Sequence, residues 1–145
     1  MLIARPKPGG DTEALIRQLD LADCIRFVGD ASHDDINRLY AESAVAVVPS
    51  LYEGFGLPAV EAMAAGIPLV SSDGGALKEV VSDGGLQVSA GDHVALAESI
   101  ARVLDDSALA AALSERGLQR VHEHFCWSVC ARQMVHQYWR RIDAC

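Results

Sequence analysis

Basic residues are scarce in this chain. Its 145 residues include 12 Lys and Arg against 20 Asp and Glu, which gives a formal net charge of −8 at pH 7. Nucleic acids and anionic membranes are bound through basic surfaces, so this balance argues against both as partners. In other respects the charge indicates only a well-solvated surface.

Long apolar runs are also missing. No uninterrupted run approaches the roughly 20 residues that a membrane-spanning helix needs. The opening stretch, MLIARPKPGG, reaches a charged residue too early to hold the apolar core of a signal peptide. We therefore expect a cytoplasmic protein without a transmembrane segment.

Cysteine is limited to four residues, and none of them forms a C-x-x-C pair: Cys24, Cys126, Cys130 and Cys145. In a cytosolic chain such residues are usually free thiols. His122 precedes Cys126 and Cys130 at four-residue spacing, which would align three metal-binding residue types on one continuous helix. Because we expect that helix to break near residues 125–128, we predict no metal site.

Apolar residues make up 50% of the chain, enough for a core, and the length is typical of one domain, so we treat residues 1–145 as one domain. Short apolar runs predict strands at residues 2–4, 25–28, 45–48, 68–71 and 86–88. Helical patterns alternate with these strands, which favours a parallel sheet with right-handed crossovers. The expected fold is α/β: a Rossmann-like parallel sheet with helices on both faces and a C-terminal helical tail after Gly91. The first strand is clipped, and such a sheet usually has one more strand–helix unit before it.

Capping residues predict where the helices start. The expected caps are Asp11 or Thr12, Ser32 in a capping box, Asp92, Ser107 and Ser128. In the helix after Asp92 we expect Ala97, Ile100 and Leu104 to face the core. We interpret Trp127 and Trp139 as packing anchors.

Residues 44–75 carry the chemistry of the chain. The run 45–48 is closed by Pro49, which predicts a strand buried on both faces, and residues 50–56 then form a loop. A helix over residues 57–65 follows, with Pro58 in its first turn and Gly66 at its end. Its N-terminus opens beside the carboxyl end of a strand, where open α/β sheets bind ligands.

This loop has the properties of a phosphate-binding site. The helix start leaves unpaired N–H groups near Phe55, Gly56 and Leu57, and the helix dipole favours an anion there. Gly54 and Gly56 permit positive φ and a close backbone approach, although both are also ordinary turn residues.

Two carboxylates, Glu53 and Glu61, stand eight positions apart on either side of the helix start. Carboxylates repel phosphate, so they are better suited to accept hydrogen bonds from hydroxyl groups. A ligand with a diphosphate between two hydroxyl-rich rings, such as a nucleotide-sugar, fits this layout. Glu61 could instead be an ordinary first-turn glutamate that complements the helix dipole.

Two other enzyme classes fit poorly. No G-x-G-x-x-G follows a predicted strand, which argues against a dinucleotide-dependent enzyme. Glycoside hydrolysis by the two glutamates would need one carboxyl kept protonated in an apolar pocket, whereas a helix N-terminus favours the ionised form.

The segment PSLYEGFGLPAVEAMAAGIPLVSSDGGALKEVV resembles the signature of the retaining glycosyltransferases of the GT-B fold, family 4. The similarity extends upstream through IRFVGDASHDDINRLYAESAVAVVPS and downstream through GDHVALAESIARVLDD, so it covers nearly the whole chain. The resemblance implies the C-terminal, donor-binding half of such an enzyme, which transfers sugar from a nucleotide-diphospho-sugar with retention of configuration.

The resemblance also implies roles for individual residues. Glu53 would be the catalytic-site residue that accepts hydrogen bonds from the donor sugar, and Glu61 would bind the ribose hydroxyls. The main chain at Asp30 and Ala31 would meet the base. The sugar and diphosphate would be held by the backbone of Gly54, Phe55, Gly56 and Leu57. The donor would be a UDP-, GDP- or ADP-sugar, and no metal or other cofactor is expected.

The chain also departs from the family pattern. Against the family pattern, we expect these 145 residues to lack the N-terminal acceptor domain and the Arg and Lys pair that neutralises the leaving diphosphate, with Arg5, Lys7 and Lys78 as poor substitutes. We therefore expect no transfer by this chain alone, and association through the final helix with a second copy or with a separate acceptor-domain chain. The alternative is a non-catalytic module that binds a nucleotide-sugar or a protein partner.

Overall fold

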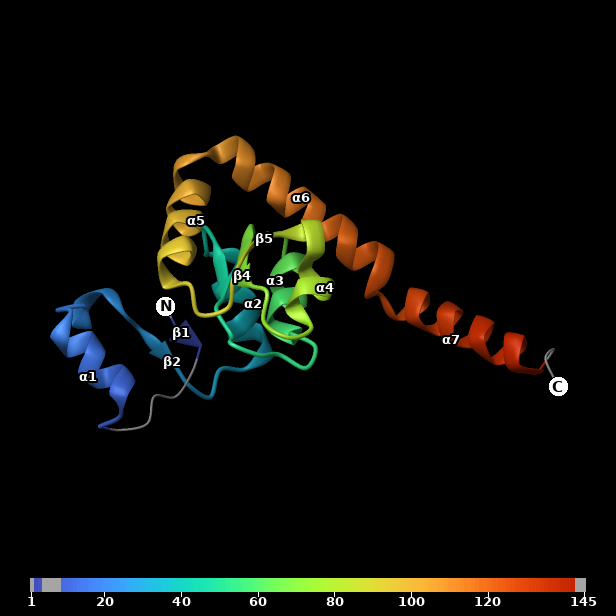
Figure 1. Cartoon of the computed structure of the whole chain (residues 1–145), viewed down its shortest axis with the longest axis horizontal. Helices are drawn as coiled ribbons and strands as arrows, with labels where there is room; N and C mark the ends of the chain where they lie inside the picture. The colour runs from blue at the N-terminus through green and yellow to red at the C-terminus, as the bar shows by residue number, and fades with distance from the viewer. Residues whose placement is uncertain (1, 4–8, 143–145) are drawn as a thin grey trace. The chain divides into compact units, whose positions relative to one another are not determined.

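The computed structural model describes residues 2–3 and 9–142, and the chain divides into two compact units, Met1–Arg38 and Leu39–Cys145. The first unit holds β1 (Leu2–Ile3), α1 (Asp11–Gln18), the 3-10 helix η1 (Ala22–Cys24), β2 (Phe27–Val28) and most of α2 (His33–Ala41). The second holds β3 (Ala46–Val48), α3 (Leu57–Ala64), β4 (Leu69–Ser72), α4 (Leu77–Val81), η2 (Ser82–Gly84), β5 (Leu86–Val88), α5 (His93–Asp105), α6 (Ser107–His124) and α7 (Trp127–Ile142) (Figure 1). Ala4, Arg5 and Lys7 lie outside the described residues.

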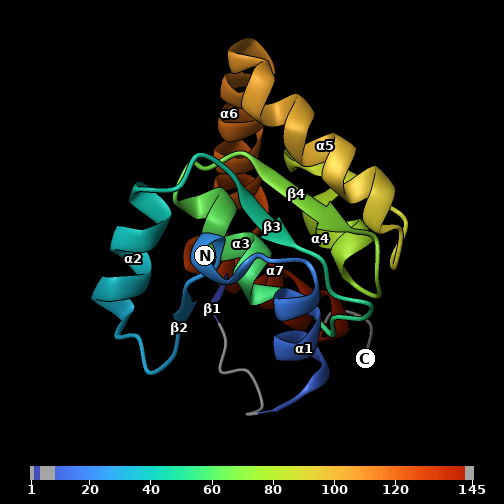
Figure 2. The same cartoon turned by 90° about the vertical axis from the view of Figure 1, so that its left-hand side faces the viewer.

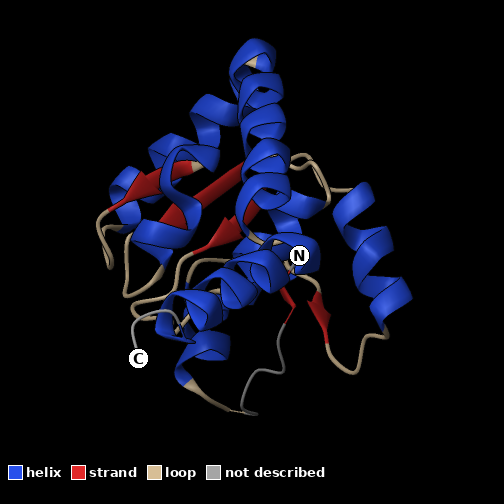
Figure 3. Ribbon diagram, turned by 90° about the vertical axis from the view of Figure 1, so that its right-hand side faces the viewer, coloured by secondary structure: helices blue, strands red, loops and turns tan. Residues whose placement is uncertain are grey.

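The strands form two parallel sheets. In the first unit β1 pairs with β2, with Leu2 opposite Phe27. In the second unit the order is β3-β4-β5, with Val47 opposite Val70 and Val70 opposite Leu86. Figure 3 shows these strands in red among the blue helices. The expected α/β class with parallel strands and a helical tail is confirmed, but the described strands divide between two sheets instead of joining in one.

Helix α2 begins with the expected capping box. The amide and the hydroxyl of Ser32 both donate to Asp35 Oδ2, at 3.1 Å and 2.6 Å, and the Asp35 amide donates back to Ser32 Oγ at 3.2 Å. These bonds from Ser32 hold the pKa of Asp35 below its usual value. Helix α1, in contrast, has Gly10 as its N-cap without a side-chain bond, so the expected cap at Asp11 or Thr12 is wrong. Asp11 already lies inside the helix, where its position serves the helix dipole instead.

Strand β4 lies between two layers of helices in the second unit. Leu69 packs into an apolar cluster with α3 and α4, which includes Ala59, Met63 and Leu77. The next residue, Val70, faces the other way and packs against Val103 of α5 and Leu113 of α6. Figure 2 shows α5 above the strands and α3 below them. Helices therefore cover both faces of β4, as the alternation of side chains along a strand requires.

Strand β3 does not have the predicted burial on both faces. Val48 is buried, but Val47 is 37% exposed. The reason is that β3 is the outer strand of its sheet and contacts α3 on one face, whereas α5 covers β4 and β5. Among the strands for which the structure describes side-chain burial, β4 is buried throughout.

The helical tail confirms one predicted cap and corrects two. Asp92 Oδ1 accepts from the Ala95 amide at 2.9 Å at the start of α5. Helix α6 is capped by Asp106, whose Oδ1 accepts from the Leu109 amide at 2.9 Å, and Ser107 is already helical. The expected break is present, but α7 begins at Trp127, ahead of the predicted cap Ser128.

The inner face of α5 includes Ile100, as predicted, but Leu96 and Val103 take the places predicted for Ala97 and Leu104. Val103 is 2% exposed, and Leu96 and Ile100 pack beside it. Leu104 is 55% exposed and Ala97 is also exposed. Contact with Val70 and Leu113 sets this face, and the sequence pattern alone allowed either set of residues.

Helix α7 presents exposed apolar side chains, as expected from the sequence. Val135, Tyr138, Trp139 and Ile142 are each more than half exposed. Trp127 is 90% exposed and Trp139 is 59% exposed, so the predicted role of both as packing anchors is wrong. At this break the inward-facing aromatic residue is Phe125, which packs on the cluster around Met63.

Adjacent residues of α5 test the corrected orientation. We expect Val103→Ala to lower the free energy of unfolding by about 2 kcal/mol, because it opens a cavity in the core. We expect Leu104→Ala to change it by less than about 0.5 kcal/mol. Urea unfolding followed by circular dichroism measures both, and equal losses would contradict the assigned face.

Candidate functional site

The loop between β3 and α3 docks on the turn that follows β4. Glu53 and Gly75 form an isolated parallel bridge, and the Ala76 amide donates to the Glu53 carbonyl at 2.9 Å. The loop thus lies at the carboxyl end of the second unit's sheet, the usual ligand edge of a parallel sheet.

Two glycines make this docking possible. A Cβ on Gly74 would stand 2.5 Å from the Leu51 carbonyl oxygen and 2.7 Å from that of Ser50. Gly75 has φ +62°, and a Cβ there would overlap the Glu53 carbonyl oxygen. Any larger residue would push the loop away, so the glycines fix how closely Glu53 approaches β4.

The Glu53 side chain is partly buried and held from within the loop. Ser50 Oγ donates to Glu53 Oε1 at 2.7 Å. Ser50 is held in turn by Ser72 of β4, whose hydroxyl donates to the Ser50 carbonyl. Sequence reasoning assigned neither serine a role.

The start of α3 has the geometry expected of an anion site. Gly56 is its N-cap with φ +94°, and the Gly56 carbonyl accepts from the amides of Ala59 and Val60 at 3.0 Å and 3.3 Å. Within the described part of the chain, the amides of Phe55, Gly56 and Leu57 make no hydrogen bond. These N–H groups remain available at the positive end of the helix dipole.

Gly54 differs from Gly56. It is not among the glycines with positive φ, so it does not use the conformational freedom that glycine permits there. A Cβ on Gly54 would have no atom within 4 Å, whereas one on Gly56 would lie 2.6 Å from Leu77 Cδ2. The space beside Gly54 is open, which suits a close approach by a ligand.

Glu61 lies exposed on α3, one turn beyond the helix start. Tyr40, at the end of α2, is its neighbour: burial, and then the negative charge of Glu61, raise the pKa of Tyr40 above its usual value. The Tyr40 hydroxyl also donates to the Pro58 carbonyl at 3.3 Å. Sequence reasoning gave Tyr40 no role at this site, and the polar tip of a phenol at that position was the available signal.

The ring of Phe55 packs against another aromatic ring. It meets Phe125 edge to face, with ring centroids 5.7 Å apart, and remains 44% exposed. The loop around it displays further exposed apolar side chains, namely Leu51, Tyr52 and Leu57. The polar groups of this site are therefore set within an apolar rim.

Asp30 and Ala31 belong to the first unit, in the connection between β2 and α2. Asp30 has φ +51°, an uncommon backbone conformation for a residue with a side chain. Their assignment to the base stays a prediction from the resemblance.

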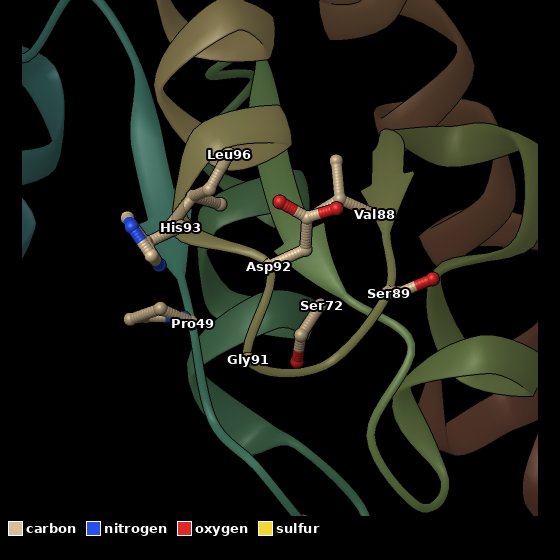
Figure 4. A pocket seen from close by; sticks show the side chains of 8 residues that line it. All are labelled: Pro49, Ser72, Val88, Ser89, Gly91, Asp92, His93 and Leu96. Carbon is tan, nitrogen blue, oxygen red and sulfur yellow. The ribbon is translucent and has the colours of Figure 1, made fainter.

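A pocket of about 100 Å³ opens at the same end of the second unit's sheet, and sequence reasoning missed it. It lies where β3, β4 and β5 end and α5 begins, as Figure 4 shows. Its lining residues are Pro49, Ser72, Val88, Ser89, Gly91, Asp92, His93 and Leu96. Ser72 joins this pocket to the loop, since its hydroxyl bonds to Ser50.

The His122, Cys126 and Cys130 spacing does not produce a metal cluster. The helix break separates His122 from Cys130, although Cys126 Sγ lies 3.8 Å from His122 Nδ1. Among the described residues, no group of three or more His, Cys, Asp or Glu side chains could hold a metal ion. In the same part of the chain, no helix has the length and apolar character needed to cross a membrane.

Comparison with known proteins identifies the family. The model of glycosyl transferases group 1 matches residues 10–120. This chain belongs to the glycosyl transferases group 1 family. MMP alpha-(1->4)-mannosyltransferase of Mycolicibacterium hassiacum is 39% identical over 150 residues, which cover 99% of this chain and 36% of that relative.

Solved glycosyltransferases of the GT-B fold share the structure. Sucrose-phosphate synthase from Thermosynechococcus elongatus superposes with a TM-score of 0.83 at 36% identity, over 99% of this chain and 38% of that one. HepE from Anabaena, in complex with UDP-glucose, gives 0.80 at 25% identity, over 90% of this chain and 36% of that one. This group 1 chain therefore spans little more than a third of the length of these relatives.

A matched pair of glycine variants tests the loop geometry of this group 1 chain. Gly56→Ala should lower the free energy of unfolding by about 1–3 kcal/mol, because alanine is strained at this φ and its Cβ meets Leu77. Gly54→Ala should change it by no more than about 0.5 kcal/mol. Chemical denaturation compares the two, and an unaffected Gly56→Ala would contradict the left-handed N-cap.

Proposed function

We propose that this chain binds the nucleotide-diphospho-sugar donor of a retaining glycosyltransferase. The observation that carries the proposal is the loop before α3, where unpaired amides at a helix start lie between two carboxylates. Amides and the helix dipole suit a diphosphate, and carboxylates suit hydroxyl groups. The complex of the related HepE with UDP-glucose supports this class of ligand.

The diphosphate and sugar would occupy the start of α3. The amides of Phe55, Gly56 and Leu57 are free to donate to phosphate oxygens, and the open space beside Gly54 admits the ligand to the backbone. Glu53 would accept hydrogen bonds from the sugar.

Glu61 would bind the ribose hydroxyls. It is exposed, so its carboxylate is accessible to a ligand, and Tyr40 stands beside it as a neutral hydroxyl whose raised pKa keeps it protonated. The main chain at Asp30 and Ala31 would contact the base.

We also place the protein in the cytosol, since the described cysteines Cys24, Cys126 and Cys130 are free thiols, as is usual in a reducing compartment.

We propose no transfer by this chain alone. Catalysis needs positive groups that stabilise the leaving diphosphate, and losing such stabilisation costs orders of magnitude in rate. Arg120, a partly buried basic side chain of α6, is turned away from this loop, because it donates to the Val80 carbonyl and pairs with Asp83. The same observation favours the second candidate function, a non-catalytic nucleotide-sugar-binding or protein-interaction module. Sugar transfer restored by adding an acceptor-domain chain would separate the two.

Calorimetric titration tests donor binding. UDP, GDP, ADP, UDP-glucose and GDP-mannose are titrated into the whole chain and into Glu61→Ala. We expect one nucleotide to bind, and Glu61→Ala to weaken it about tenfold, the size of a lost hydrogen bond to a charged group. Glu98→Ala, on the exposed face of α5, is the matched control.

The ribose assignment has its own readout. If Glu61 accepts from the ribose, wild type should prefer the nucleotide over its 2′,3′-dideoxy analogue, and Glu61→Ala should lose that preference. A preserved preference would contradict the role of Glu61, and no binding by a folded sample would contradict the proposed function.

The exposed apolar face of α7 supports association with a second copy or with a chain carrying the acceptor domain. This face is formed by Val135, Tyr138, Trp139 and Ile142. Contiguous exposed apolar patches are typical of surfaces through which proteins associate. We expect sedimentation velocity to show a dimer at high concentration, and Trp139→Glu to shift it toward monomer. A monodisperse wild-type monomer at high concentration would contradict self-association.

A further inference from the structure

The Glu53 carboxylate has one oxygen occupied and one available. Oε1 accepts from Ser50 Oγ at 2.7 Å, a normal length for a hydroxyl donor. Within the described residues, Oε2 has no hydrogen-bond partner. A free glutamate side chain samples many rotamers, so this bond restricts the directions in which Oε2 can accept.

Ser50 is itself fixed by the sheet. Ser72 is 2% exposed at the end of β4, and its hydroxyl donates to the Ser50 carbonyl. The Gly74 amide in turn donates to Ser72 Oγ at 3.4 Å, and Ser72 lies opposite Val88 of β5. A chain of hydrogen bonds therefore runs from the buried end of β4, through Ser72 and Ser50, to the Glu53 carboxylate.

We propose that Ser50 is the positioning residue of Glu53, and that Ser72 holds Ser50 in that role. The inference rests on the proposed function and deepens it, because it concerns the sugar half of the ligand and leaves the nucleotide half unaffected. Ser50 sets Oε2 to accept from a hydroxyl of the donor sugar. Removing the Ser50 hydroxyl releases the carboxylate and weakens recognition of the sugar.

The backbone of the loop does not depend on the Ser50 hydroxyl. The loop is also held by the Ala76 amide on the Glu53 carbonyl and by the close approach at Gly74 and Gly75, neither of which involves Ser50 Oγ. Ser50→Ala should therefore leave the start of α3 in place, and with it the binding of diphosphate.

The test compares a nucleotide with its sugar conjugate on the whole chain. UDP with UDP-glucose, and GDP with GDP-mannose, are titrated calorimetrically, and the pair that wild type binds is kept. Ser50→Ala should weaken the nucleotide-sugar about fivefold to tenfold and the bare nucleotide by less than about twofold. Ser50→Thr, which keeps the hydroxyl, should restore sugar binding, and Ser128→Ala on exposed α7 is the control.

A double-mutant cycle with Glu53→Ala distinguishes positioning from loop support. If Ser50 acts through the carboxylate, Ser50→Ala should have less than about a twofold effect once Glu53 is alanine. Should Ser50→Ala fail to fold, Ser50→Cys keeps the volume with a weak donor and is expected to give the same selective loss.

The two proposals fail differently. An equal loss for nucleotide and nucleotide-sugar, or an effect that persists in the Glu53→Ala background, overturns the role of Ser50 and leaves donor binding intact. No binding of either probe pair by folded wild type overturns both.

Discussion

Close packing of residues 50–56 against the turn after β4 is the constraint on which the candidate site depends. Gly74 and Gly75 allow the two backbones to meet without Cβ atoms, and the Ala76 amide ties the turn to the Glu53 carbonyl. This contact places the Glu53 carboxylate and, three residues later, the left-handed Gly56 that starts α3. The carboxylate and the amides therefore share one support, and a displacement of the turn would move both.

The support is rigid because β4 is covered on both faces. Leu69 and Val70, adjacent in β4, are fully buried in different apolar clusters. Helix α6 contributes to both clusters, through Leu113 on one side and Val121 on the other, where its C-cap residue Phe125 also packs. Phe125 also reaches the loop through its edge-to-face contact with Phe55. The helical tail thus braces the site loop as well as the sheet.

Local patterns predicted the elements well and their orientation less well. The loop–helix boundary at Leu57, the end of α3 at Gly66 and the capping box at Ser32 follow from residue chemistry within a few positions, and all three are observed. Part of the inner face of α5 and the cap of α6 were placed one residue away, and α7 begins ahead of its predicted cap, because neighbouring residues were equally plausible in each case. Trp127 was misplaced because apolar character does not indicate whether another element lies within reach.

By itself, the sequence determined the α/β alternation, the glycine-bearing loop and the two glutamates. Each depends on residues close together in the chain or on chemistry that a residue carries anywhere. Only the tertiary structure decided which groups hold the site: the bond from Ser72 to Ser50, the approach of Tyr40 to Glu61, and the pocket at the ends of three strands. Ser50 and Ser72, like Tyr40 and Glu61, are about 20 residues apart in sequence, so only the packing of strands and helices brings the members of each pair together.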